Sequence, residues 1–255
     1  MQIVAIRRRR AGERSKMARY FGLVPAAGVG RRFGGELPKQ YQDVAGTPLI
    51  AHSIAALLAE ARVEAVFVVL SAHDERFGRI SWRADADRVV PLYCGGESRM
   101  TSVYNGLIGC ADAIDLDDWV LVHDAVRPCL AATDLRRLID AIDDAEIGGL
   151  LAAPVADTLK SDDGEGRVAR TVERAALWRA LTPQMFRYGT LLNALGAGRS
   201  QDPTITDEAS AVERLGRRPR LIPGSGTNLK VTLPEDIAMV AAWLRAHRSS
   251  HCTES

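Results

Sequence analysis

Small residues and cations are concentrated in one segment near the N-terminus, PAAGVGRRFGGELPKQY at residues 25–41. Gly28 and Gly30 allow the backbone to approach a phosphate chain closely and to turn N–H groups toward it. Arg32 and Lys39 add positive charge beside those amides. We therefore predict a phosphate-binding loop. The alternative is a surface turn with solvated arginines.

Two common nucleotide-binding patterns fail in this segment. The dinucleotide fingerprint G-x-G-x-x-G requires a glycine at the position of Phe33. The P-loop requires a lysine directly after a glycine, whereas Lys39 follows Pro38. A dinucleotide-dependent oxidoreductase is therefore disfavoured.

A second glycine-containing segment, CGGESRMTSVYNGL, covers residues 94–107. Gly95 and Gly96 permit close backbone approach at the end of an expected strand. Arg99 and Ser102 are three residues apart in the first turn of the expected helix, so they face one direction. A ligand-binding loop and a simple strand–turn–helix are both compatible with this pattern.

The third segment, VLVHDAVRPCL, places a carboxylate directly after an apolar strand. Asp124 is positioned to meet a hard cation or a ligand hydroxyl, and Mg²⁺ prefers one or two carboxylates together with phosphate oxygens and water. Arg127 can pair with Asp124 or with an anion. The alternative is an Asp–Arg pair that fixes the loop, and His123 is expected to be structural rather than a base.

Strands and helices alternate between these motifs. Short apolar runs predict strands at 21–25, 64–70, 89–93, 119–123 and 148–155. Apolar periodicity predicts helices at 48–60, 99–110 and 134–145, the last with Thr133 as its N-cap. This alternation predicts an α/β fold with an open, doubly wound, mostly parallel sheet. Ligands bind such sheets beyond the carboxyl ends of the strands, where the first and third motifs lie.

The alternation is interrupted by a polar segment at 157–174, DTLKSDDGEGRVARTVER, which predicts a β-hairpin that leaves the main body. It resumes at 175–195. Thr206 precedes a helix expected to end at Leu215, short strands are expected at 220–223 and 228–231, and a helix at 234–247. We expect one domain at 21–248, including an arm at about 156–175. A flexible basic extension at 1–20 and a tail at 249–255 flank it.

Composition excludes several classes of protein. The 255 residues are 47% hydrophobic and 25% charged, which is typical of globular proteins. With 33 Lys and Arg against 32 Asp and Glu, the net charge of +1 disfavours nucleic acid as a partner. No apolar stretch is long enough to predict a membrane span. Four cysteines without a C-x-x-C predict neither zinc nor disulfides, so a reducing compartment, the cytoplasm, is expected.

The motifs resemble those of one enzyme family when they are read in order. P-A-A-G-x-G-x-R, P-K-Q, G-G-x-x-R-x-x-S-V and H-D-A-x-R-P are followed by APVADTLK, TVERAALWRALTPQMF, TITDEASAVE and NLKVTLPED. This series resembles the 2-C-methyl-D-erythritol 4-phosphate cytidylyltransferases of the non-mevalonate isoprenoid pathway, from about Leu23 to Leu244. Val126 and Glu97 stand where that family often has Ala and Asp.

The resemblance implies that the enzyme takes CTP as its nucleotide donor. It assigns Arg32 to the triphosphate, and Lys39 and Lys230 to the charge at the reacting phosphorus. It assigns to the CTP loop Ala26, Ala27, Gly28 and Gly30, and to the cytosine Gly96 and Ser102.

The resemblance also implies a methylerythritol phosphate acceptor and Mg²⁺. Asp124 would lie beside the acceptor or in the Mg²⁺ shell, with Arg127 next to it. Thr158, Arg174 and Thr206 would contact the acceptor phosphate. The hairpin of this family reaches a second subunit, so a homodimer with shared sites is expected.

The implied reaction is attack by a phosphate oxygen on the α-phosphorus of CTP. A phosphate with a second pKa of about 6 is already mostly dianionic at pH 7, so no general base is needed. Two rivals remain: a cytidylyltransferase for another polyol phosphate, such as ribitol 5-phosphate, and a nucleotide-binding module without activity. The joint presence of Arg32, Lys39, Asp124 and Lys230 disfavours the module.

Overall fold

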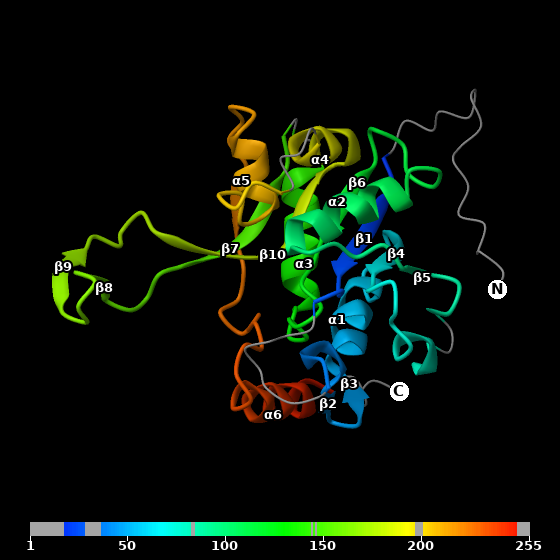
Figure 1. Ribbon diagram of the computed structural model, residues 1–255, viewed down its shortest axis with the longest axis horizontal. Coiled ribbons are helices and arrows are strands. Elements are labelled where there is room, and N and C mark those ends of the chain that lie inside the picture. The colour runs from blue at the N-terminus through cyan, green and yellow to red at the C-terminus, as the bar shows by residue number, and fades with distance from the viewer. Residues whose placement is uncertain are drawn as a thin grey trace.

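A seven-stranded sheet forms the centre of the molecule (Figure 1). The computed structural model describes residues 18–28, 37–82, 85–143, 145, 147–196 and 201–248. The strands are β1 (Tyr20–Pro25), β4 (Val63–Val69), β5 (Val89–Leu92), β6 (Trp119–Val122), β7 (Gly149–Pro154), β10 (Trp178–Arg187) and β11 (Arg220–Pro223). Their order is β11-β7-β10-β6-β1-β4-β5. Only β10 runs antiparallel to its neighbours, so the predicted mostly parallel sheet is confirmed.

Helices cover both faces of this sheet. They are α1 (Leu49–Leu58), α2 (Arg99–Gly109), α3 (Ala132–Ile142), α4 (Tyr188–Leu195) and α5 (Glu208–Glu213). Helix α6 (Asp236–Arg248) packs outside these layers, in a separate apolar cluster. Successive residues of β1 point to opposite faces: Val24 packs in the apolar cluster with α1 and α3, and Leu23 in the cluster with α2, α4 and α5. Burial of the strands on both faces explains why their sequences are almost continuously apolar.

A third, smaller apolar cluster holds two loops against α6. Val126, Val231, Val240 and Leu244 are buried in it. Leu49, at the start of α1 beside the short hairpin of β2 (Asp43–Val44) and β3 (Thr47–Pro48), belongs to the same cluster. The loops that carry Arg127 and Lys230 are therefore anchored on one helix.

A two-stranded arm leaves the main body (Figure 1). Strands β8 (Leu159–Asp162) and β9 (Val168–Val172) pair only with each other within the described residues. The arm buries almost nothing: Val168 is 63% exposed. The hairpin predicted from the polar segment is present.

Several boundaries differ from those expected. Arg19 is buried and β1 begins at Tyr20, so the folded body starts before the expected boundary at residue 20. The N-cap of α3 is Ala131, not Thr133. The cap of α5 is Asp207 rather than Thr206, because Asp207 and Ser210 exchange side-chain and backbone hydrogen bonds.

Two strand predictions also need correction. Residues 228–231 form no strand, because the Val231 N–H binds Val126 O rather than a sheet neighbour. The sequence pattern does not predict the ten-residue strand β10. Its Pro183 lies at a break in the pairing with β7, and a proline inside an apolar run argues against a strand.

The cysteines that the structure describes, Cys94, Cys110 and Cys129, form no disulfide. In the same part of the chain, no helix is both long and apolar enough to span a membrane.

Candidate active site

Asp124 lies just beyond the carboxyl end of β6 and is surrounded by three cationic side chains. Its Oδ1 accepts from Arg99 Nε at 2.9 Å, and its Oδ2 lies 3.0 Å from Lys230 Nζ and 3.3 Å from Arg127 Nε. Burial alone would raise the pKa of Asp124, but the charges of Arg99, Lys230 and Arg127 hold it well below the usual range. The carboxylate is therefore ionised at neutral pH.

The backbone joins the loops that carry Arg127 and Lys230. Arg127 Nη1 donates to Asn228 O at 2.8 Å, and Val231 N donates to Val126 O at 2.9 Å. The side chain of Lys230 is 44% exposed, against 11% for that of Arg127. Lys230 therefore presents its ammonium group to solvent and to Asp124 together.

His123 is a structural residue, as expected. The Asp124 N–H donates to Thr182 Oγ1 at 3.1 Å. Because Arg127 O can only accept, His123 Nε2 carries the ring proton, and Nδ1 of the neutral ring accepts from the Thr182 hydroxyl at 2.9 Å. His123 Nε2–H then donates to Arg127 O at 3.0 Å. Burial lowers the pKa of His123 to about 4, so the ring is neutral at pH 7. Both ring nitrogens are used, and neither is left to accept a substrate proton.

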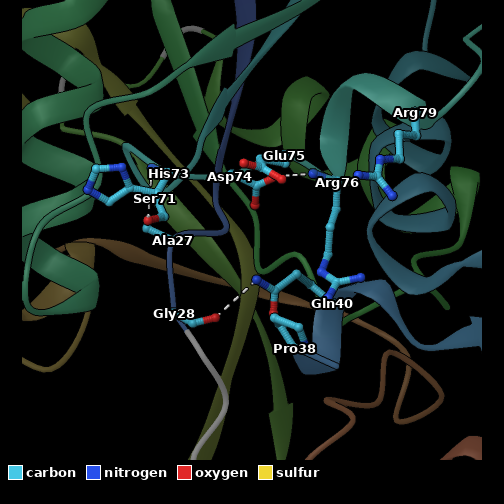
Figure 2. A pocket seen from close by; sticks show the side chains of 10 residues that line it. All are labelled: Ala27, Gly28, Pro38, Gln40, Ser71, His73, Asp74, Glu75, Arg76 and Arg79. Atoms are coloured by element: carbon cyan, nitrogen blue, oxygen red, sulfur yellow. Dashed lines mark hydrogen bonds between the residues drawn. The ribbon is translucent and has the colours of Figure 1, made fainter. Parts of the chain in front are cut away.

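The backbone of the Gly-rich loop lines one side of a cavity of about 340 Å³ (Figure 2). Ala27 and Gly28 line it from the end of β1, and Arg76 and Arg79 line it from the turn that follows β4. Gln40 holds the loop: its Nε2 donates to Ala26 O at 2.8 Å and to Gly28 O at 3.0 Å. Gly30 and Arg32, predicted for the same loop, lie outside the described residues.

Lys39 begins the short 3₁₀ turn Lys39–Tyr41 after this loop. Asp236, at the start of α6, accepts from the N–H groups of Leu233 and Thr232. These bonds, and then the charge of Lys39, lower the pKa of Asp236. Lys39 is thus near enough to Asp236, at the start of α6, for its charge to stabilise that carboxylate.

The loop predicted to bind cytosine lies at the end of β5. Ser102 Oγ accepts from Gly96 N at 3.0 Å and donates to Ser98 O at 2.9 Å, so the loop is closed on the first turn of α2. A Cβ on Gly95 would lie 2.2 Å from the Cβ of Ala27. The two predicted nucleotide loops therefore touch at a position where only glycine fits.

Two of the three predicted contacts to the acceptor phosphate lie on the arm, and the third lies next to α5. Thr158 and Arg174 are exposed at the base of the arm, where the Arg174 guanidinium donates to Ala156 O. Thr206 is exposed just before α5, and its N–H donates to Ser210 Oγ at 3.1 Å. Within the described residues, no hydrogen bond or ion pair joins these three residues to Asp124.

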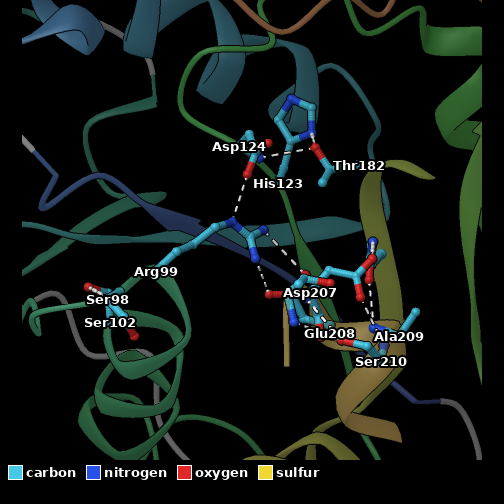
Figure 3. A network of polar contacts seen from close by, with 12 residues as sticks. Ser98, Arg99, Ser102, His123, Asp124, Thr182, Asp207, Glu208, Ala209 and Ser210 are labelled. Carbon is cyan, nitrogen blue, oxygen red and sulfur yellow. Dashed lines mark hydrogen bonds and ion pairs between the residues drawn. The ribbon is translucent and has the colours of Figure 1, made fainter. Parts of the chain in front are cut away.

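Two residues absent from the sequence prediction belong to this site. Arg99 contacts Asp124 directly, and fully buried Glu208 binds Arg99, with Oε1 2.7 Å from Arg99 Nη1 (Figure 3). The second glycine-containing segment includes Arg99, but the partner of Arg99, Glu208, lies 109 residues away in the sequence. Sequence periodicity carries no signal for such a pair.

The described residues do not form a cage for a resident metal ion. They contain no group of three or more His, Cys, Asp or Glu side chains that could hold one. Both oxygens of Asp124 already contact cations. A divalent ion here needs most of its ligands from a substrate, as Mg²⁺ does when it is bound to phosphate oxygens.

Comparisons with known proteins agree on one family. A family model described as 2-C-methyl-D-erythritol 4-phosphate cytidylyltransferase matches residues 21–246. A relative of that name from Azoarcus sp. strain BH72 is 51% identical and covers 91% of this chain and 96% of its own. Another, from Dechloromonas aromatica strain RCB, is 50% identical and covers 91% of this chain and all of its own, 100%.

Solved structures give the same result. A crystal structure of a 4-diphosphocytidyl-2C-methyl-D-erythritol synthase, 37% identical, aligns with a TM-score of 0.78 over 89% of this chain and 99% of that one. The 2-C-methyl-D-erythritol 4-phosphate cytidylyltransferase from Thermus thermophilus, 29% identical, aligns with a TM-score of 0.71 over 90% and 99%. With its fold, its motifs and nearly its whole length matched, this chain belongs to the 2-C-methyl-D-erythritol 4-phosphate cytidylyltransferase family.

Proposed function

We propose that this chain transfers CMP from CTP to 2-C-methyl-D-erythritol 4-phosphate, and that the transfer takes place beside Asp124. An acceptor phosphate oxygen attacks the α-phosphorus and forms a new P–O bond. The bond from the α-phosphorus to the bridging oxygen breaks, and pyrophosphate leaves. The observation that carries this proposal is the group of three cations around Asp124, beyond the same sheet edge as the two nucleotide loops.

The acceptor needs no general base, because its phosphate is already mostly dianionic at pH 7. This agrees with the state of His123, which is neutral, fully buried and hydrogen-bonded through both nitrogens. The chemical difficulty is instead that two anions must meet while negative charge grows on the leaving group. Positioned cations address it.

Charge is divided unevenly among the residues of the site. Arg99, Arg127 and Lys230 face the two carboxylates of Asp124 and Glu208, so the group carries one net positive charge when both carboxylates are ionised. Burial raises the pKa of Glu208, and the charge of Arg99 opposes this rise. Lys230 is the most exposed of these cations. We assign to Lys230, together with Lys39 and Arg32, the stabilisation of the reacting and leaving phosphates.

Mg²⁺ enters, in this proposal, as part of the CTP complex rather than as a resident ion. Bound to CTP, the ion would neutralise charge on the triphosphate and would so make pyrophosphate a better leaving group. Asp124 lies at the proposed reaction centre, and the charges of Arg99, Lys230 and Arg127 keep it ionised. Titration of Mg²⁺ in the absence of CTP distinguishes this arrangement from one in which an Asp124 oxygen holds the ion.

The arm supports a homodimer. An isolated two-stranded ribbon is marginal in water, and β8 and β9 have no other neighbour in the described residues. We propose that the arm pairs with a second copy and carries Thr158 and Arg174 to the neighbouring site. A shared site explains why these residues lie apart from Asp124 in a single chain.

Release of pyrophosphate from CTP tests the function directly. We expect release with 2-C-methyl-D-erythritol 4-phosphate and none without an acceptor. Ribitol 5-phosphate is the matched control for the rival polyol phosphate, and ATP, GTP and UTP are the controls for the donor. Equal turnover of both acceptors, or release without any acceptor, contradicts the proposal.

A further inference from the structure

A buried carboxylate that touches no predicted substrate position lies at the back of the site. Glu208 is 0% exposed at the first position of α5. Its Oε1 lies 2.7 Å from Arg99 Nη1, and its Oε2 lies 3.3 Å from Arg99 Nη2. This is a two-pronged carboxylate–guanidinium pair, which fixes orientation as well as charge.

Arg99 directs a third N–H donor toward the reaction centre. While Glu208 holds both terminal nitrogens, Arg99 Nε donates to Asp124 Oδ1 at 2.9 Å (Figure 3). The other oxygen of Asp124 is left to Lys230 and Arg127. The orientation of Asp124, and with it the position of the Lys230 ammonium, thus depends on a guanidinium that Glu208 holds.

The pair also connects three segments that are distant in sequence. Arg99 begins α2, next to the loop that closes on Ser102; Asp124 follows β6; and Glu208 begins α5, two residues after Thr206. A displacement of α5 would therefore be transmitted through Arg99 to Asp124. Because the burial of Glu208 is complete, its charge has no role in contacting solvent.

We propose that Glu208 is a positioning residue for cytidylyl transfer, acting through Arg99 on Asp124; this inference rests on the function proposed above. Glu208 fixes Arg99, Arg99 fixes one oxygen of Asp124, and the other oxygen then directs Lys230 toward the reacting phosphate. Misplacement of reacting groups by about 1 Å can reduce a rate by about 100-fold, so a loosened Arg99 should lower kcat strongly.

A second buried bridge in this molecule supplies a matched control. Asp118 precedes β6 at its other end and pairs with Arg19, with Oδ2 2.6 Å from Arg19 Nη2 and 3.0 Å from its Nε. Asp118 is 2% exposed. Glu208→Gln and Asp118→Asn therefore each neutralise a buried carboxylate that is paired with an arginine. The Glu208 pair contacts Asp124 beyond the carboxyl end of β6, and Asp118 lies directly before the start of β6.

The experiment measures kcat, KM for CTP and thermal unfolding of both variants, per folded protein, with Lys230→Ala assayed beside them. We expect Glu208→Gln to lower kcat at least about tenfold. KM for CTP should stay within about threefold, because the cytosine loop keeps its own Gly96–Ser102 bond. Asp118→Asn should lower the unfolding temperature but leave kcat within about twofold. A smaller decrease in Glu208→Gln, or an equal decrease in both variants, overturns the inference.

The double variant Arg99→Met/Glu208→Leu covers the case in which Glu208→Gln does not fold. Replacement of both members of a buried pair by apolar residues leaves no orphaned charge, and Asp124 keeps Arg127 and Lys230. A folded double variant with kcat still reduced at least about tenfold supports positioning. Recovery of kcat together with stability overturns it. If Lys230→Ala loses activity and the Glu208 variants keep theirs, only this inference is refuted. If Lys230→Ala keeps full activity, the proposed site itself is refuted.

Discussion

Lys230 Nζ lies 3.0 Å from Asp124 Oδ2, although 106 residues separate them in the chain. The contact forms because Val231 N donates to Val126 O and because both valines are buried against α6. The anchored backbone of this loop thereby positions the exposed ammonium group of Lys230 beside Asp124. Its partner carboxylate is in turn held by Arg99 and Arg127.

Replacement of either predicted catalytic lysine should greatly reduce turnover. We expect Lys39→Ala and Lys230→Ala each to lower kcat at least about 100-fold, because one preorganised cation at developing charge contributes about that much. Thermal unfolding should change little, since the Lys230 side chain is 44% exposed. Arg137→Ala, which removes a half-exposed cation from α3, is the control and should keep normal turnover. Normal turnover in either lysine variant contradicts the assignment.

Removal of Mg²⁺ should abolish activity without changing the protein. The described residues form no cage of metal ligands, so the ion is expected to bind with CTP. Activity should be lost after exhaustive treatment with EDTA and return with added Mg²⁺. Calorimetric titration of Mg²⁺ into the CTP-free enzyme should show no saturable binding at concentrations that support full activity. Tight binding without CTP, lost in Asp124→Asn, would instead show a resident ion on Asp124.

Stability should fall as the pH decreases below about 6.5, and His123 should be one cause. Burial lowers the pKa of folded His123 to about 4, against 6.5 for the free side chain. As the pH falls, the unfolded chain therefore protonates His123 before the folded protein does. The contribution of neutral His123 to the free energy of unfolding is present above pH 6.5 and is lost as the pH falls to 4. The difference between the two pKa values corresponds to about 3 kcal/mol.

Nuclear magnetic resonance of the histidine rings checks this prediction. The His123 ring should not titrate between pH 7 and 5 in the folded protein. In His123→Gln, the loss of unfolding free energy between pH 6.5 and 4 should shrink. Titration of His123 near pH 6.5 would contradict the proposed buried, neutral state.

Mixing two inactive variants tests the shared site. Arg174→Ala removes a residue of the arm and Lys39→Ala a residue of the body, so a hybrid dimer has one site with both lesions and one with neither. Random exchange gives hybrids in about half of the dimers, and recovered activity should approach about a quarter of wild type. Proven subunit exchange without recovered activity would mean that each site is built from a single chain.

The position of a residue can be predicted from the sequence where its neighbours in the chain determine that position. Asp124 directly follows an apolar strand, and its place at the sheet edge could be predicted because parallel strands end together. The pairing of Arg99 with Glu208 could not, because it depends on how α2 and α5 meet in three dimensions. Strand β10 could not be predicted because it contains Pro183, and a proline argues against a strand. In the folded sheet Pro183 lies at a break in the pairing with β7, so it disturbs no pairing there.

The anchoring of the Lys230 loop on α6 has a consequence for shortened chains. The last strand of the sheet, β11, ends at Pro223, before both Lys230 and α6. Truncation after Pro223 would therefore keep every strand of the central sheet and remove both Lys230 and the helix that holds its loop. Such a chain is expected to be inactive even if its sheet still folds.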